Sequence, residues 1–196
     1  MKTWVPVAVV LAGCAQSLVR PETESRAVRL PRPPQILVYE LATSRDEIHP
    51  DQGTLRQAAN RVQLPPTAAN PASHEAAAAF ADALVARLRA LGLPAERATR
   101  QTPIGRHDLL VVGAFVDEHQ SQRLGRLVVG FGAGGSQLDT EVDVLQSSGH
   151  GRWRIAQFAT HVAADGASTD VTDLAFRSAD QAAHDLARVF AREGWS

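Results

Sequence analysis

The chain has 196 residues, of which 44% are hydrophobic and 21% are charged. This composition is typical of one soluble globular domain, and it argues against a disordered, collagen-like or polytopic membrane protein. The 20 Lys and Arg side chains and 21 Asp and Glu side chains leave a formal net charge of −1, which makes nucleic acid a poor candidate partner. A chain of this length can bury a core without disulfides or structural metals.

The N-terminus has the organisation of a targeting segment. Lys2 supplies a positive start, and the apolar run from Thr3 to Ala12 is too short for a membrane span, which needs about 20 residues. The run ends in Leu-Ala-Gly-Cys at positions 11–14, and Cys14 is the only cysteine. This tetrad resembles the lipobox of bacterial lipoproteins. The resemblance implies a signal peptide over residues 1–13, cleavage between Gly13 and Cys14, and a diacylglycerol on the Cys14 thiol.

The lipobox resemblance implies a place in the cell as well. Ala15 follows the cysteine where Asp would retain such a lipoprotein in the inner membrane, so we expect the outer membrane, with the domain on its periplasmic face. Several acyl chains, palmitate among them, would then hold the protein firmly, since each buried CH₂ contributes about 0.8 kcal/mol. The alternative is an ordinary signal peptide, or a start codon assigned too late, with a chance cysteine. A single cysteine allows no intramolecular disulfide.

The mature chain divides into a tether and one domain. Residues 14–34 have no sustained hydrophobic period and end in prolines, as a flexible tether does. We place the domain at residues 35–196, beginning with a buried strand from Ile36 to Leu41. The stretch from Ala42 to Ala72 is rich in turn signals and long for a loop, which makes it a candidate functional region.

Two helices follow from apolar residues at helical spacing. The first is predicted from Ser73 to Leu91, with Ser73 as N-cap, Glu75 in the first turn and Gly92 closing the end. Its apolar face comprises Ala77, Phe80, Leu84, Leu88 and Leu91. The second is predicted from about Ser178 to Glu193, with an inner face of Ala179, Ala182, Leu186, Val189 and Phe190.

Several strands are predicted between these helices. They are Pro94–Arg100, Asp108–Val116, Gly125–Phe131, Gln137–Gln146 and Arg152–Val162, with turns at Gly132–Gly135 and Ser147–Gly151. The order of strand, helix, run of strands and helix indicates a single α/β (α+β) domain. We expect a mixed, largely antiparallel sheet with two main helices packed on one side.

The glycine-rich segment resembles a known family. Residues 123–134 read Arg-Leu-Gly-Arg-Leu-Val-Val-Gly-Phe-Gly-Ala-Gly. They are similar to the signature of an uncharacterised bacterial lipoprotein family, domain of unknown function 4410, whose members show Gly-Asn-Arg, a second Arg and Gly-Phe-Gly-Ala-Gly. Gly194-Trp195 matches the Gly-Trp with which members often end, whereas Ser121-Gln122 stands where Gly-Asn is expected. The family has no assigned catalytic residues, so the resemblance implies none here.

The glycine-rich segment also matches the consensus sequence of a dinucleotide-binding motif. Gly130, Gly132 and Gly135 give G-x-G-x-x-G after a strand, but a dinucleotide site needs a helix next. The alternation from Leu138 to Val144 predicts a strand instead. We therefore expect no nucleotide and no cofactor. Arg123, Arg126, Gly130, Phe131, Gly132 and Gly134 are taken as a structural or partner-binding motif, with contact of Phe131 with lipid or a partner as one reading.

Acidic residues alternate along the next strand. Asp139, Glu141 and Asp143 share one strand face, with neighbouring carboxylates about 7 Å apart. We expect a solvated face that pairs across a hairpin with Arg123 and Arg126 in a structural role. A Ca²⁺ site or acid–base chemistry on this row is the alternative.

No compact catalytic or metal motif is present. The seven histidines (His49, His74, His107, His119, His150, His161 and His184) show no metal-ligand spacing, so surface histidines and no metal are expected. Ser136 lacks the final glycine of a nucleophile elbow. We therefore expect a non-catalytic envelope domain that binds a protein or envelope component. The alternatives are a hydrolase or transferase with its site near the 42–72 loop and the glycine turn, or a small-ligand or metal sensor.

Overall fold

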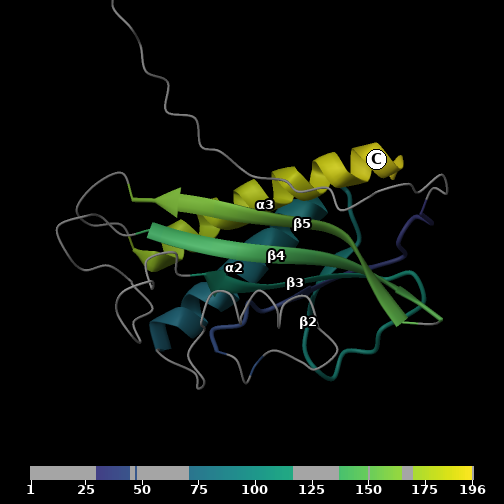
Figure 1. Cartoon of the computed structure of the whole chain (residues 1–196). Helices are drawn as coiled ribbons and strands as arrows, with labels where there is room; N and C mark the ends of the chain where they lie inside the picture. The colour runs from purple at the N-terminus through teal and green to yellow at the C-terminus, as the bar shows by residue number, and fades with distance from the viewer. Residues whose placement is uncertain are drawn as a thin grey trace, which may run out of the picture.

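The computed structural model describes residues 30–44, 47, 71–116, 137–149, 151–164 and 170–195 (Figure 1). Five strands and two helices lie in this part of the chain. In chain order they are β1 (Ile36–Tyr39), α2 (Pro71–Ala90), β2 (Ala95–Ala98), β3 (Leu109–Val116), β4 (Gln137–Ser148), β5 (Gly151–Ala163) and α3 (Val171–Glu193).

The strands form one open sheet in the order β2-β1-β3-β4-β5. β1 lies between β2 and β3 and is parallel to both, whereas β4 lies between β3 and β5 and is antiparallel to both. The parallel β1–β2 pair needs a crossover, which α2 provides. The predicted fold class is therefore confirmed: a mixed sheet with two helices in one α+β domain.

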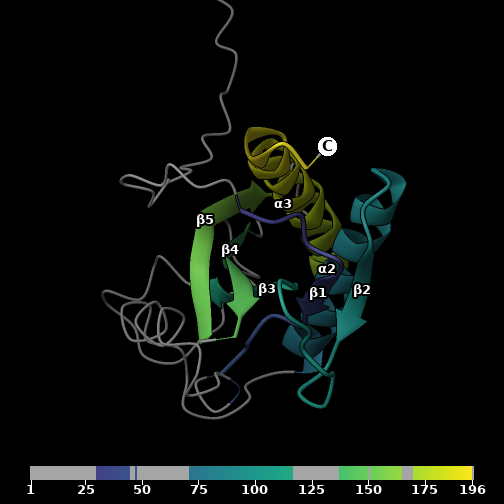
Figure 2. The same ribbon diagram turned by 90° about the vertical axis from the view of Figure 1, so that its right-hand side faces the viewer.

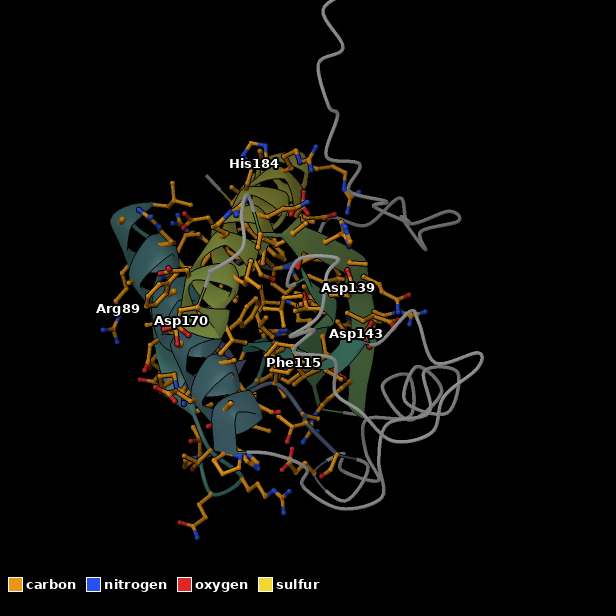
Figure 3. All side chains as sticks on the ribbon, turned by 90° about the vertical axis from the view of Figure 1, so that its left-hand side faces the viewer. Arg89, Phe115, Asp139, Asp143, Asp170 and His184 are labelled. Atoms are coloured by element: carbon orange, nitrogen blue, oxygen red, sulfur yellow. The ribbon has the colours of Figure 1, made fainter. Side chains whose placement is uncertain are left out.

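Both helices cover the same face of the sheet (Figure 2). The alternation of side chains along β3 makes this possible, since Leu109, Val111 and Phe115 join the core beneath the helices. Leu110, Val112 and Ala114 point to the opposite face and form a smaller apolar cluster with Ala42 and Leu145. Figure 3 shows Phe115 between the sheet and the helices, with Asp139 and Asp143 of β4 on the side of the sheet away from the helices.

The first predicted helix is present but begins earlier than the sequence indicates. α2 starts at Pro71, a residue suited to the first helical turn because it has no N–H to satisfy there. Ser73 is consequently inside the helix and fully buried, so the expectation that it caps the helix is wrong. Glu75 lies beyond the first turn. Leu91 follows the helix end and is 56% exposed, unlike the other four residues of the predicted apolar face.

The second predicted helix begins two turns before the expected start. α3 runs from Val171, and the carboxylate of Asp170 caps it by accepting a hydrogen bond from the Thr172 N–H at 3.2 Å. The predicted start at about Ser178 is therefore wrong. Ser178 lies in the helix interior, fully buried against the sheet. The predicted inner face of α3 is confirmed, since all five of its residues are buried.

The neighbours of β4 differ from the prediction. Residues Asp139–Gln146 pair with β3, and the whole of β4 pairs with β5, so both hydrogen-bonding edges of β4 are occupied by these two strands. The hairpin expected between Gly125–Phe131 and β4 is therefore wrong as a sheet pairing. The predicted strand itself lies in the connection from β3 to β4, outside the described residues.

The N-terminal end of the described chain is fastened to the C-terminal end. Leu30 packs against the main core, and its carbonyl accepts a hydrogen bond from the Trp195 indole N–H at 3.1 Å. The next carbonyl, that of Pro31, accepts one from Gln146 at 3.0 Å. The contacts of the domain therefore begin at Leu30, within the segment that the sequence assigns to the tether.

Candidate functional site

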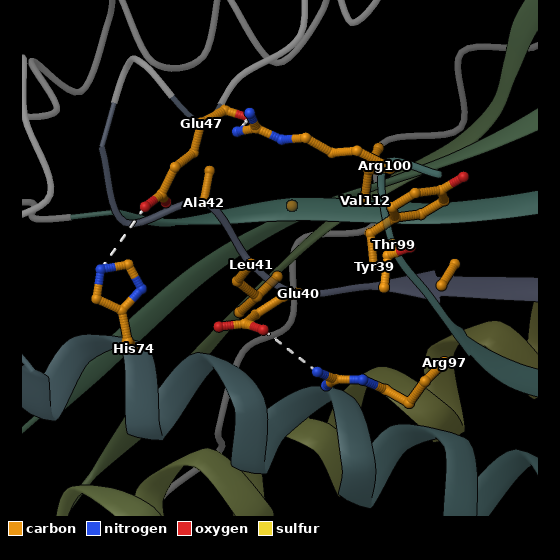
Figure 4. A pocket seen from close by; sticks show the side chains of 12 residues that line it. Tyr39, Glu40, Leu41, Ala42, Glu47, His74, Arg97, Thr99, Arg100 and Val112 are labelled. Carbon is orange, nitrogen blue, oxygen red and sulfur yellow. Dashed lines mark hydrogen bonds and ion pairs between the residues drawn. The ribbon is translucent and has the colours of Figure 1, made fainter. Parts of the chain in front are cut away.

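A pocket of about 300 Å³ opens at the carboxyl ends of the parallel strands (Figure 4). Its walls come from the end of β1 (Tyr39 to Ala42), the end of β2 (Ala98 to Arg100) and the middle of β3. The strand order reverses at β1, because α2 leads to β2 on one side while β3 lies on the other. Open α/β sheets bind ligands at such a reversal.

The pocket exists because the segment after Tyr39 no longer pairs with β2 but still pairs with β3. Ala42 pairs with Ala114 in an isolated parallel bridge, and its N–H donates to the Gly113 carbonyl at 2.8 Å. Leu41 fills the space that Gly113 leaves by having no side chain, since a Cβ there would lie 2.6 Å from Leu41 Cδ2. The segment from Glu40 to Ala42 therefore diverges from the end of β2 and opens the crevice.

One wall of the pocket is organised by Glu47. Its Oε2 accepts hydrogen bonds from the Thr43 N–H at 2.6 Å and from the Thr43 hydroxyl at 3.1 Å. Its Oε1 lies 3.7 Å from Nε2 of His74, which projects from the first turns of α2. Glu47 therefore fixes the chain just after β1 and faces the imidazole across the pocket.

The opposite wall is organised by Arg97 of β2. Its guanidinium donates to the Ala78 carbonyl of α2 at 3.1 Å and to Glu40 Oε2 at 3.2 Å. The Nε of Arg97 also lies 3.5 Å from a carboxylate oxygen of Asp82. This side chain joins β2, α2 and the end of β1, and its charge is balanced by two carboxylates.

Arg100 is bound more loosely. One of its amino groups donates to the Glu47 carbonyl at 3.4 Å, beyond the usual range of 2.7–3.2 Å for such a bond. Neighbouring Thr99 accepts and donates within its own turn, with Thr102. Arg100 therefore presents a positive charge over the pocket without an ion-pair partner among the described residues.

Tyr39 lines the pocket and has a shifted pKa. Burial raises the pKa of its hydroxyl above the ordinary value near 10, because burial disfavours the phenolate. Arg152 opposes the shift by lowering the pKa, and the carboxylate of Asp108 adds to it. The tyrosine is therefore neutral throughout the physiological range.

The predicted acidic row is paired along the β4–β5 hairpin. Asp139 bonds to His161, Glu141 accepts from Gln157, and Asp143 lies 3.4 Å from Arg154. Asp143 is fully buried, so the expectation of a solvated face is wrong at this position. These partners lie on β5, the strand that pairs with β4. The expected partners Arg123 and Arg126 lie outside the described residues.

The other predicted site residues lie outside the described part of the chain: Gly13, Cys14, Gly130, Phe131, Gly132 and Gly134. The pocket residues Glu40, Arg97 and Arg100 were not singled out from the sequence. Glu47 was included only as part of the candidate stretch from Ala42 to Ala72, and His74 only as an isolated histidine. The signal that could have found them is weak. It consists of charged residues placed just after each of two parallel strands.

The described residues show neither a metal-binding cluster nor a membrane-spanning helix. They contain no group of three or more His, Cys, Asp or Glu residues placed to hold a metal ion. None of the described helices is long and apolar enough to cross a membrane.

Comparison with known proteins identifies a family. The model of a family described as a domain of unknown function (DUF4410) matches residues 36–187. The chain belongs to this family. The match spans β1 through most of α3, so the pocket lies within the family domain. A comparison with curated proteins gave no match.

Solved structures of similar shape include two PelC dodecamers from Paraburkholderia phytofirmans. A variant form has 12% sequence identity and a TM-score of 0.47, covering 89% of this chain and 98% of that chain. A second PelC dodecamer structure has 14% identity and a TM-score of 0.44, covering 89% and 97%.

Proposed function

We propose that the protein is a lipid-anchored cell-envelope protein whose domain binds a protein or another envelope component without catalysing a reaction. The observation that carries this proposal is Cys14, the only cysteine, placed directly after a short apolar run that ends in Leu-Ala-Gly. A thiol at this position is what lipoprotein acylation needs.

The attachment of the tether supports an anchored domain. Leu30 and Pro31 are held by Trp195 and Gln146, at the end of the sheet where β1 begins. The 16 residue steps from Cys14 to Leu30 could span at most about 58 Å when fully extended, at about 3.6 Å per residue. The domain would therefore stay within a few nanometres of the membrane that holds the lipid.

The roles of the pocket charges support a binding rather than a catalytic domain. Glu47 is committed to the Thr43 backbone, and Arg97 is committed to the Ala78 carbonyl and to Glu40. Groups bound in this way hold the segment after β1 and the α2–β2 packing in place. Their positions are explained by the fold, without a substrate.

The anchor is tested by acylation and cell fractionation. We expect the intact mass of the mature wild type to include the acyl chains on Cys14 and the protein to fractionate with outer membranes. Cys14→Ser should be released into the soluble periplasm. Ser17→Ala, a nearby change that leaves the thiol intact, should stay membrane-bound. A mature wild-type protein with an unmodified cysteine would contradict the proposal.

The binding role is tested by crosslinking in intact envelopes. The wild type and the soluble Cys14→Ser form should capture the same partner after affinity purification, because the folded domain carries the binding surface. Turnover of a small substrate by the purified domain, without a captured partner, would favour a hydrolase or transferase instead.

A further inference from the structure

The pocket at the ends of β1 and β2 has features that anchoring and partner binding do not use. It is concave, about 300 Å³ in volume, and placed where the strand order reverses. Pockets of this size are at the lower end of the range that binds small molecules. Its chemistry can be read from the side chains that line it.

Most of the lining charges are already satisfied. Arg97 contacts both Glu40 and Asp82, and the Glu47 carboxylate accepts two hydrogen bonds from Thr43. A ligand that paired with any of these groups would have to replace an existing contact. They therefore form the walls of the pocket and contribute little to the charge that a ligand meets.

Arg100 differs from the other charged residues of the pocket. Its hydrogen bond to the Glu47 carbonyl is long, at 3.4 Å, and uses one of five N–H donors. The side chain belongs to the pocket lining, and Figure 4 shows it extended from the end of β2 toward Glu47. A guanidinium with free donors matches a carboxylate, which can accept two parallel hydrogen bonds from it.

The rest of the lining is apolar where the crevice meets the sheet. Leu41, Ala42 and Val112 line the pocket beneath the charged groups. Leu41 and Val112 are fixed, because Leu41 packs against Gly113 and Val112 belongs to the central strand β3. This surface favours a ligand with a short hydrocarbon part next to its charged group.

We propose that this pocket binds a small organic acid. The carboxylate accepts hydrogen bonds from Arg100, and the hydrocarbon part contacts Leu41, Ala42 and Val112. The site lies at the opposite end of β1 from the Leu30–Trp195 contact. The proposal does not depend on the lipid anchor and holds for the unacylated chain.

Calorimetric titration of the purified full chain with hexanoate tests the proposal. Hexanoate should bind saturably at one site per chain. Hexanamide, which has the same hydrocarbon part without the charge, should bind at least tenfold more weakly. Inorganic phosphate should not compete, because it lacks the hydrocarbon part. Phosphate binding without hexanoate binding would overturn the assignment of an organic acid.

Two variants test whether hexanoate binds at the proposed site. Arg100→Gln should weaken hexanoate binding by about tenfold or more, the loss expected for one charge-assisted contact. Arg106→Gln removes an exposed arginine from the next connection, outside the pocket lining, and should leave binding unchanged. Circular dichroism should show both variants folded. Undiminished hexanoate binding by folded Arg100→Gln, or no saturable binding by the wild type at millimolar concentrations, would overturn the proposal.

Discussion

The indole N–H of Trp195 donates a hydrogen bond to the carbonyl of Leu30, 165 positions earlier in the chain, at 3.1 Å. Trp195 is 3% exposed and packs against Phe190 with ring centroids 5.6 Å apart. Gly194 makes this possible by taking a left-handed conformation, with φ of 76°, that ends α3 and turns the chain back onto the helix. The Gly-Trp ending thus joins the end of the domain to its beginning.

Replacing Trp195 should therefore destabilise the whole domain. Trp195→Phe removes the hydrogen bond and should lower the free energy of unfolding by about 1 kcal/mol. Trp195→Ala also empties a buried site and should cost about 3–5 kcal/mol. Urea unfolding measures both changes. Phe176→Ala is the matched control, because Phe176 is 45% exposed and its loss should change stability by less than about 0.5 kcal/mol. Equal effects of the two alanine variants would contradict this role of Trp195.

Three buried hydroxyls join α3 to the sheet, and their loss should be costly. Thr160 of β5 bonds to Thr140 of β4 at 2.6 Å and also to Ser178 of α3. Thr160→Val keeps the shape but leaves two buried hydroxyls without their shared partner, so it should cost about 1–3 kcal/mol. A double-mutant cycle with Ser178→Ala, followed by urea unfolding, should show coupling between the two sites. Additive effects would indicate that the contact contributes little.

Ser178 illustrates which features of the fold can be predicted from the sequence and which cannot. Apolar residues at helical spacing located the inner face of α3, because that period is local to the helix. The predicted helix start at about Ser178 is wrong, because α3 begins at Val171. The partner of Ser178, Thr160, lies on a strand 18 positions earlier, and only the packing of α3 on the sheet brings them together.

The candidate site shows a stronger form of this limit. Arg97 and Arg100 lie in or just after a four-residue strand with little sequence signal. They face Glu40 and Glu47 only because β1 pairs in parallel with β2, in a register that joins Val38 with Arg97. Strand order and register are tertiary properties. The residues of the pocket can therefore be read from the sequence individually but not as a group.

Leu41 and the backbone of β4 approach Gly113 of β3 closely, so we expect replacement of this glycine to destabilise the fold. A Cβ at Gly113 would lie 2.5 Å from the Glu141 carbonyl oxygen of β4, a backbone atom that cannot move away easily. Gly113→Ala should lower the free energy of unfolding by about 1–3 kcal/mol or more, as overpacking does. Gly149→Ala in the β4–β5 turn is the control, because nothing lies within 4 Å of its Cβ position. Thermal unfolding should separate the two variants clearly, and equal melting temperatures would contradict the prediction.

The raised pKa of Tyr39 predicts a loss of stability in alkali. Because burial raises the pKa in the folded state, the unfolded chain loses this proton first, near pH 10, while the folded chain still keeps it. The stabilising contribution of the neutral hydroxyl is therefore complete below about pH 10, and it is lost as the pH rises through the folded-state pKa.

Titration of the wild type and Tyr39→Phe checks this prediction. Tyr39 is the only tyrosine in the chain, so the near-ultraviolet absorbance of tyrosinate reports this residue alone. The folded protein should titrate at higher pH than the chain in concentrated urea. The free energy of unfolding of the wild type should fall above about pH 10 more steeply than that of Tyr39→Phe, which has no hydroxyl to ionise. Coincident titration curves for the folded and unfolded wild type would show that burial does not hold the proton on Tyr39.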